Sequence, residues 1–295
     1  MADEKLTQLT EDTAPALTDL TYGVKNPGGT PLSRKLTWTT VLNQTKNPGL
    51  LHGLTLSNNV TDATNDIDIA AGTARDSTDV TNMIGSALTK RLDAAWAVGT
   101  NQGGLDTGSI ANTTYHVWLI KRSDTGVVDA LFSTSASAPT MPINYNYKRR
   151  IGSIVRSGGA IKAFVQDGDD FFWKVPVQDV NATNPGTSAV TRTLTVPTGI
   201  RVKAILSINT DALTTSDCPG AVLFSDLSTT DNTPSTSLSN MFHYFVLAAE
   251  TSIGAQVQVW TNTSGQIRSR IQLSGTNTNL YVSTFGWIDR RGKDS

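Results

Sequence analysis

The residues with the clearest potential for chemistry are two copies of Asp-Thr-Gly, which begin at Asp106 and Asp124. The first copy continues into serine, and Asp-Thr-Gly-Ser is the loop that carries the catalytic carboxylate in aspartic proteases. That chemistry needs two such loops, because two carboxylates about 3 Å apart must share one proton so that one acts as base and the other as acid. Hydrophobic segments on both sides must also thread each loop through the centre of a lobe.

The flanking sequence favours ordinary turns over a protease site. Residues 98–105 (VGTNQGGL) are glycine-rich and polar, so they do not thread Asp106 through a core. The second copy lies between two β-rich runs, 115–122 and 127–133, where Asp-Thr-Gly is typical of a hairpin and Gly126 can adopt a positive φ. The copies are also too close in sequence to belong to separate lobes. We therefore interpret both as turns and predict no catalytic residues.

Other candidates for chemistry are few. Asp167, Asp169 and Asp170 cluster in VQDGDDFF, but this segment lacks the distal glutamate and the spacing of an EF-hand, so a hairpin turn is a better interpretation than a calcium loop. The three histidines are scattered singly and offer neither a metal site nor a Ser-His-Asp set. No dinucleotide or phosphate-loop motif is present. The sequence predicts no metal and no cofactor.

Composition and charge exclude several classes of function. The length of 295 residues suggests about two domains, and the net charge of −1 gives no electrostatic basis for binding nucleic acid or a membrane. No run approaches the roughly 20 apolar residues that span a bilayer, and the acidic N-terminus is the opposite of a secretory signal. The lone cysteine, Cys218, excludes an intrachain disulfide and fits assembly in a reducing cytosol.

The chain is rich in threonine, serine, asparagine and glycine, and this composition indicates the fold class. Threonine suits half-exposed strands, and asparagine, glycine and serine suit tight turns. We predict a mainly β fold, with a short N-terminal hairpin docking segment followed by two β-sandwich or jelly-roll-like domains.

The predicted N-terminal segment covers residues 1–45. The runs LTYGVK (20–25) and LSRKLTW (32–38) flank NPGGTP and predict a small hairpin, and residues 39–45 suggest a short helical turn. A hairpin of this size is marginally stable alone in water. We therefore interpret the segment as an element that docks on something else.

Two β domains are predicted after this segment, at 46–176 and 177–295. Residues 86–98 are ambiguous, because their apolar spacing also fits a helix, whereas 149–175 predict a three-stranded meander with a bulge or two-sided burial near Ile151, Ile154 and Val155. Residues 176–190 lack periodicity and contain two prolines, so the domain boundary is placed there.

Four tryptophans in β-like runs leave two interpretations open. Packing in a core or an interface is favoured for each of them, but a threonine- and asparagine-rich sandwich with aromatic residues in its loops also suits glycan binding. These residues are Trp118, Trp173, Trp260 and Trp287.

Three blocks of sequence resemble the fibre and minor virion proteins of tailed bacteriophages. YGVKNPGGTPLSRKLTWTTVL resembles their N-terminal segment, where a D-P-x-G-T-P-x-S-x-K-x-T stretch precedes the body of the chain. The run from LTKRLDAAWAVG to SASAPTMP, followed by RRIGSIVR, resembles their body domain. TNTSGQIRSRIQLSG through FGWIDRRG resembles their C-terminal domain. The resemblance spans nearly the whole chain, and the long middle block is its most specific part.

The resemblance implies a non-enzymatic virion structural protein, most specifically a tail fibre or tail-associated subunit that is assembled in the host bacterial cytoplasm. It also implies a homotrimer, other phage tail or connector proteins as partners, and no insertion into a membrane. The alternative is a receptor-binding protein that recognises a host surface glycan through a distal β domain. An enzyme acting on polysaccharide or peptide is a third and weaker hypothesis. The docking residues expected in the N-terminal segment are Tyr22, Lys25, Arg34, Lys35 and Trp38.

Overall fold

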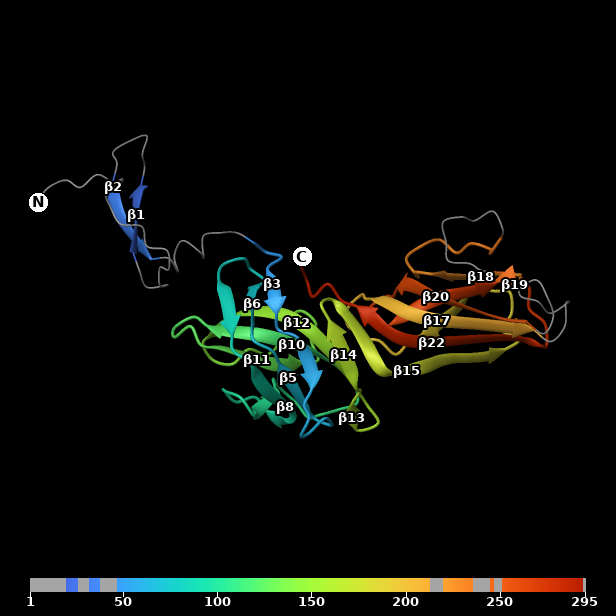
Figure 1. Cartoon of the computed structure of the whole chain (residues 1–295), viewed down its shortest axis with the longest axis horizontal. Helices are drawn as coiled ribbons and strands as arrows, with labels where there is room; N and C mark the ends of the chain where they lie inside the picture. The colour runs from blue at the N-terminus through green and yellow to red at the C-terminus, as the bar shows by residue number, and fades with distance from the viewer. Residues whose placement is uncertain are drawn as a thin grey trace, which may run out of the picture.

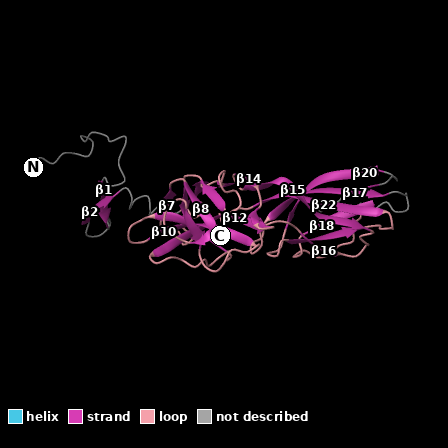
Figure 2. Cartoon of the chain, turned by 90° about the horizontal axis from the view of Figure 1, so that it is seen from below, coloured by secondary structure: helices cyan, strands magenta, loops and turns pink. Residues whose placement is uncertain are grey.

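The computed structural model describes residues 20–25, 32–37, 47–212, 220–235, 245–246 and 251–293. Every regular element in these residues is a β-strand, and the 22 strands form five sheets. Two β units lie end to end, as two perpendicular views show (Figure 1 and Figure 2). The predicted mainly β fold class is confirmed. The described residues include no helix that could cross a membrane.

The N-terminal hairpin consists of β1 (Leu20–Lys25) and β2 (Leu32–Thr37), which pair antiparallel from Leu20↔Thr37 to Lys25↔Leu32. The predicted hairpin over these residues is therefore confirmed. Within the described residues these two strands pair only with each other. The helical turn predicted over 39–45 lies outside the described residues.

The central unit (residues 51–161) contains an eight-stranded sheet, in the order β13-β12-β10-β11-β9-β8-β5-β4, and a three-stranded sheet, in the order β3-β6-β7. The apolar run YHVWLI makes β10 an interior strand with buried side chains on both faces. The strands are β3 (Leu51–Gly53), β4 (Leu56–Asn58), β5 (Asp66–Ile69), β6 (Gly72–Arg75), β7 (Asn82–Gly85), β8 (Leu88–Ala95), β9 (Gln102–Leu105), β10 (Thr114–Arg122), β11 (Val128–Ser133), β12 (Tyr145–Ser157) and β13 (Ala160–Ile161).

The ambiguous segment 86–98 forms a strand, β8. Lys90 and Leu92 are buried on one face, and the residues between and after them, Arg91 and Asp93, are exposed, which is the period of a strand. Lys90 can be buried because its Nζ lies 3.2 Å from Asp129 Oδ1 and donates to the carbonyl of Ala97 at 2.7 Å. The apolar spacing of this segment also fitted a helix because lysine was counted as a surface residue, whereas Lys90 lies on the core face of the strand.

The C-terminal unit (residues 164–288) contains a five-stranded sheet, in the order β14-β15-β22-β17-β20, and a four-stranded sheet, in the order β16-β21-β18-β19. Both sheets contribute to one hydrophobic cluster, through Leu206 and Val282 on one side and Val222 and Ile267 on the other, so the unit is sandwich-like. The strands are β14 (Phe164–Asp167), β15 (Asp170–Thr183), β16 (Val190–Thr193), β17 (Lys203–Ala212), β18 (Gly220–Ser225), β19 (Phe245–Val246), β20 (Thr251–Trp260), β21 (Gln266–Ile271) and β22 (Thr278–Ile288).

Strand β15 passes through the position where the domain boundary was placed. It runs from Asp170 to Thr183 and pairs with β22 from Asp170↔Ile288 to Thr183↔Asn279. The stretch that lacks periodicity in the sequence, 176–190, therefore begins inside a strand and leaves it after Thr183. The strand tolerates Pro176 because the pairing with β22 skips this stretch at a register shift between Phe172 and Val177. The division into domains at 46–176 and 177–295 stays a prediction.

The bulge predicted near Ile151 is confirmed. On β12, four consecutive residues from Ile151 to Ile154 are buried, so both faces of the strand are covered. The register with β10 shifts between Val117, opposite Gly152, and Trp118, opposite Arg150, which leaves Ile151 as the extra residue. The bulge lies next to the arginines that tie the two units together.

Candidate functional site: an arginine junction between the two units

The two Asp-Thr-Gly aspartates belong to separate surface loops. Asp106 Oδ2 accepts a hydrogen bond from the backbone N–H of Thr140 at 2.8 Å. Asp124 accepts from Arg122 Nε at 2.8 Å and Nη2 at 2.6 Å, and these bonds lower the pKa of Asp124 to about 2. In the described residues the two carboxylates share no hydrogen-bond partner. The second copy forms the β10–β11 hairpin turn with φ of +76° at Gly126, as predicted.

The aspartate cluster at 167–170 forms the β14–β15 hairpin, in which Asp167 pairs with Asp170. The predicted hairpin turn is confirmed. Asp169 does not face other acids but two cations, since it accepts from Arg291 Nη2 at 2.7 Å and from Lys293 Nζ at 2.8 Å. Burial alone would raise the pKa of Asp169, but the hydrogen bonds from Lys293 and Arg291 outweigh burial and hold the pKa below its ordinary value.

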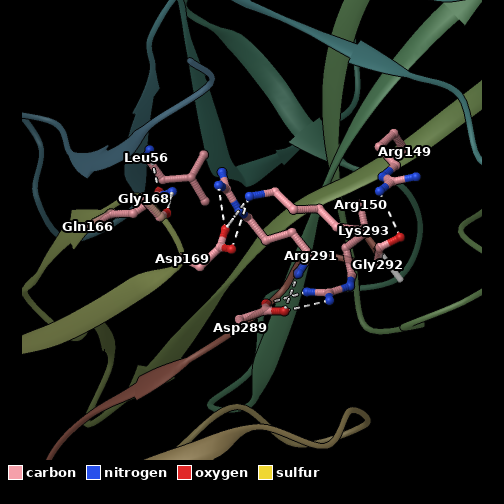
Figure 3. Close-up of polar contacts among 10 residues, drawn as sticks. All are labelled: Leu56, Arg149, Arg150, Gln166, Gly168, Asp169, Asp289, Arg291, Gly292 and Lys293. Atoms are coloured by element: carbon pink, nitrogen blue, oxygen red, sulfur yellow. Dashed lines mark hydrogen bonds and ion pairs between the residues drawn. The ribbon is translucent and has the colours of Figure 1, made fainter. Parts of the chain in front are cut away.

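Arg291 and Lys293 belong to residues 289–293, which follow the last strand and return to the central unit. We call the set Arg149, Arg150, Asp169, Asp289, Arg291 and Lys293 the arginine junction (Figure 3). Its arginines at 149 and 150 lie on β12 of the central unit, and its other members belong to the C-terminal unit and the residues after it. The described residues contain no group of three His, Cys, Asp or Glu side chains that could hold a metal ion.

The shortest ion pair of the arginine junction joins Arg150 and Asp289. Arg150 donates to both carboxylate oxygens, at 2.5 and 2.7 Å, and the side chain of Asp289 is only 2% exposed. Asp289 Oδ1 also accepts from the backbone N–H of Arg291 at 2.8 Å. Two parallel N–H···O bonds are the preferred geometry of guanidinium with carboxylate, and burial removes competing water. This pair fixes the end of β22 against β12.

Arg149 is held differently from its neighbour. Its Nη1 donates to the carbonyl of Pro48 at 3.0 Å and its Nη2 to the carbonyl of Gly292 at 2.7 Å, while the residue is 3% exposed. Burial, followed by the positive charges of Arg150 and Arg291, lowers the pKa of Arg149. The Arg149 side chain therefore links the residues before β3 to the residues after β22. Among the described residues it makes no hydrogen bond to a carboxylate.

A further polar bridge lies beside this cluster (Figure 3). Gln166 Oε1 accepts from the backbone N–H of Leu56 at 2.8 Å, and its Nε2 donates to the carbonyl of Gly168 at 2.9 Å. On the same side, Asn58 Oδ1 accepts from the N–H of Phe164 at 3.1 Å. These bonds join β4 of the central unit to β14 of the C-terminal unit, so side chains satisfy backbone groups where the two sheets meet.

Sequence reasoning missed a serine–histidine pair at the same junction. His116 Nδ1 lies 2.9 Å from Ser153 Oγ, and Arg150 Nη1 donates to that same oxygen at 3.2 Å. Burial, followed by the charge of Arg150, lowers the pKa of His116 to about 4, so the ring is neutral at pH 7. Both residues are 0% exposed, so a substrate cannot reach the hydroxyl in this structure. No sequence signal links residues 37 positions apart on neighbouring strands.

The predicted docking residues lie on the N-terminal hairpin, apart from Trp38, which lies outside the described residues. Tyr22 and Lys35 are direct cross-strand partners, Arg34 is opposite Gly23, and Lys25 is opposite Leu32 at the end of the pairing. The hairpin register therefore brings Tyr22 and Lys35 together, and the docking role of this set stays a prediction.

The core interpretation of the tryptophans holds for three of the four. Trp118, Trp173 and Trp287 are at most 5% exposed, and Trp287 stacks on Phe171 with ring centroids 5.0 Å apart. Trp260 is only partly buried at the end of the sheet-edge strand β20. Lys203 Nζ lies 5.3 Å from the centroid of its ring.

Comparisons with known proteins identify no family for this chain. No family model and no curated protein matches the chain. An isomalto-dextranase of Arthrobacter globiformis T6, solved in complex with panose, is 12% identical with a TM-score of 0.21, over 75% of this chain and 35% of the dextranase. A structure of infectious bursal disease virus, Gx strain, is 11% identical with a TM-score of 0.25, over 83% of this chain and 73% of the viral chain. This chain thus spans about a third of the dextranase.

Proposed function

We propose that this chain is a non-enzymatic structural subunit of a tailed-bacteriophage virion, a tail fibre or tail-associated protein that docks through residues 1–45. The proposal starts from the resemblance of the three sequence blocks to phage fibre and minor virion proteins. In this proposal the chain assembles as a homotrimer in the bacterial cytoplasm and binds other tail or connector proteins.

One structural observation supports a scaffold role above the others. The two β units are joined by side-chain bonds: Arg150 and Asp289 form a buried bidentate ion pair, and Gln166 and Asn58 each accept a backbone N–H from the opposite unit. A subunit that transmits position from a docking segment to a distal domain needs such a stiff connection, because few contacts usually cross between domains and relative motion is the default. The side chains with the best potential for chemistry, Asp124 and Ser153, are used in structural hydrogen bonds.

The decisive experiment uses the phage that carries this chain. We expect mass spectrometry of gradient-purified particles to detect the full-length chain, and we expect deletion of residues 1–45 to give a folded, soluble protein that no longer enters particles. The matched control deletes only residues 227–235, which lie outside the strands, are distant in sequence from the hairpin and should preserve incorporation when removed. Particles that carry the truncated chain at the normal copy number would refute docking through residues 1–45, and absence of the full-length chain from all particles would refute the virion assignment.

A second candidate, recognition of a host surface glycan, is supported by Trp260. This ring is partly exposed on the C-terminal unit, and aromatic faces of this kind bind sugars by apolar contact. A glycan array probed with the full chain should then give signals that disappear in Trp260→Ala. The buried Trp173 is no suitable control because its removal would damage the core, so the partly exposed Trp96 of the central unit serves instead. A blank array at high protein concentration would remove this candidate.

A further inference from the structure

A cavity of about 210 Å³ opens beside the arginine junction, where β10, β12 and the residues after β22 meet. Arg149, Arg150 and Arg291 contribute to its wall, Trp118 provides an aromatic surface, and Ser77 and Ser137 add hydroxyl groups. Binding sites for whole small molecules typically measure about 300–1,000 Å³. This cavity is therefore suited to a small ion or to one end of a larger molecule.

The charges around the cavity do not balance. Within the arginine junction, four cationic side chains, those of Arg149, Arg150, Arg291 and Lys293, stand against the carboxylates of Asp169 and Asp289. Asp289 is paired with Arg150, and Asp169 is shared by Arg291 and Lys293. Arg149 has only backbone carbonyls as partners among the described residues. No carboxylate of the described residues bonds Arg149 directly, and even when the charge of Asp76, which also acts on Arg149, is included, the four cations face three carboxylates, so the site favours an added negative charge.

Two of the guanidinium groups also keep unused donors. Arg149 Nε and Arg291 Nη1 are buried, and neither has a hydrogen-bond partner in the described structure. Both residues are 3% exposed, and both line the cavity. Buried donors almost always have acceptors, and a buried donor left without one destabilises a protein. An acceptor that enters the cavity would remove this cost.

We propose that the cavity binds a small oxyanion, either a phosphate ion or a carboxylate group, between the guanidinium groups of Arg149 and Arg291. Guanidinium groups suit this ligand because their planar N–H donors match the oxygens of phosphate and carboxylate. Both unused donors are covered by protein atoms when the cavity is empty, so binding requires their guanidinium groups to turn toward it. The bound anion neutralises Arg149 and strengthens the connection between the two units.

Isothermal titration of the full chain at constant ionic strength tests this proposal, with inorganic phosphate in one arm and glucuronate in the other. Saturable binding of phosphate alone identifies a free inorganic ion as the ligand, and binding of glucuronate identifies the carboxylate of an acidic sugar. Either result supports an oxyanion site. Chloride at the same ionic strength is the reference, because weak electrostatic attraction alone does not saturate. Absence of saturable binding in both arms at millimolar ligand overturns the proposal.

Two arginine substitutions locate the site. Arg149→Lys keeps the charge but removes the planar donors, and we expect at least a tenfold loss of affinity. Arg156→Lys is the matched control: Arg156 lies on the same strand, also lacks a carboxylate partner among the described residues and also has an unpartnered Nε, but it does not line the cavity. The Arg156→Lys variant should bind the oxyanion with the same affinity as the unsubstituted chain. Equal affinity in Arg149→Lys would overturn the location.

A third variant protects the test against misfolding of Arg149→Lys. Ser137 is exposed at the cavity, and Ser137→Glu places a carboxylate there without disturbing the core. The new carboxylate competes with the ligand, so we expect at least a tenfold loss of affinity and a higher melting temperature in the absence of ligand. Unchanged affinity in Ser137→Glu would contradict the proposal even if Arg149→Lys cannot be purified.

Discussion

Replacing Asp289 with asparagine should destabilise the protein far more than the same replacement at Asp124. Both aspartates accept two hydrogen bonds from one arginine, at 2.5 and 2.7 Å for Asp289 with Arg150 and at 2.8 and 2.6 Å for Asp124 with Arg122. The environments differ: the side chain of Asp289 is 2% exposed and that of Asp124 is 43% exposed. The comparison therefore isolates burial while the geometry stays nearly constant.

The expected magnitude follows from the buried charge that remains. Asp289→Asn leaves Arg150 as an unpaired cation at 11% side-chain exposure, and breaking a buried pair in this way costs about 3–5 kcal/mol. For a chain of this size, that corresponds to a fall in melting temperature of about 10 °C. Asp124→Asn breaks a solvent-screened surface pair and should leave the melting temperature nearly unchanged.

Urea unfolding followed by both tryptophan fluorescence and near-ultraviolet circular dichroism measures the difference. Coincident transitions by the two probes are needed before a single free energy of unfolding is assigned, because a chain of two units can unfold in steps. If the two variants lose similar stability, or if Asp289→Asn is neutral, Arg150–Asp289 does not hold the units together as described.

Three other perturbations have defined outcomes. As the pH falls from 6.5 to 4, His116 becomes protonated in the unfolded chain but stays neutral in the folded chain, where its pKa is about 4. The free energy of unfolding should therefore fall by about 3 kcal/mol across this window. A His116→Gln variant that shows the same fall would contradict the buried neutral ring. A methyl group at Gly286 would lie 2.0 Å from the carbonyl oxygen of Phe171, so Gly286→Ala should lower the free energy of unfolding in urea by about 1–3 kcal/mol. Gly254→Ala, where the nearest atom lies at 3.5 Å, should lower it less. Equal losses of stability in the two variants would refute the close approach at Gly286. Phe172 is 37% exposed on the five-stranded sheet. If this face of the sheet contributes to the proposed homotrimer, Phe172→Glu should shift the sedimentation coefficient toward that of the monomer. An unchanged oligomer would show that this face lies outside the subunit interface.

Local sequence signals predicted the strands and turns well. The N-terminal hairpin, the turns at Asp124 and Asp169, and the bulge at Ile151 all followed from alternation, glycine placement and β-branched composition. These features depend on interactions between residues close in sequence or on adjacent strands, which a pattern can represent. The same reasoning correctly placed three tryptophans in the core.

The arginine junction could not be predicted, because its partners are far apart in the chain. Arg150 and Asp289 are separated by 139 positions, and Arg291 and Asp169 by 122. In the sequence these residues look like solvated surface charges, since they lie in the short polar runs 148–150 (KRR) and 289–292 (DRRG). The same limitation explains β8, where Asp129, on another strand, compensates the charge of the buried Lys90. Pairing between charges that are distant in the sequence thus determines structure that the local apolar spacing leaves ambiguous.

The return of residues 289–293 to the central unit has a consequence for biosynthesis. A ribosome delivers β12 long before it delivers Asp289 and Gly292, so Arg150 lacks its carboxylate partner and Arg149 lacks one of its two carbonyl partners while about 140 further residues emerge. During that interval Arg150 of the nascent central unit carries a positive charge without its later carboxylate partner. That charge discourages premature association between neighbouring nascent chains, and it is neutralised only when residues 289–293 reach the central unit.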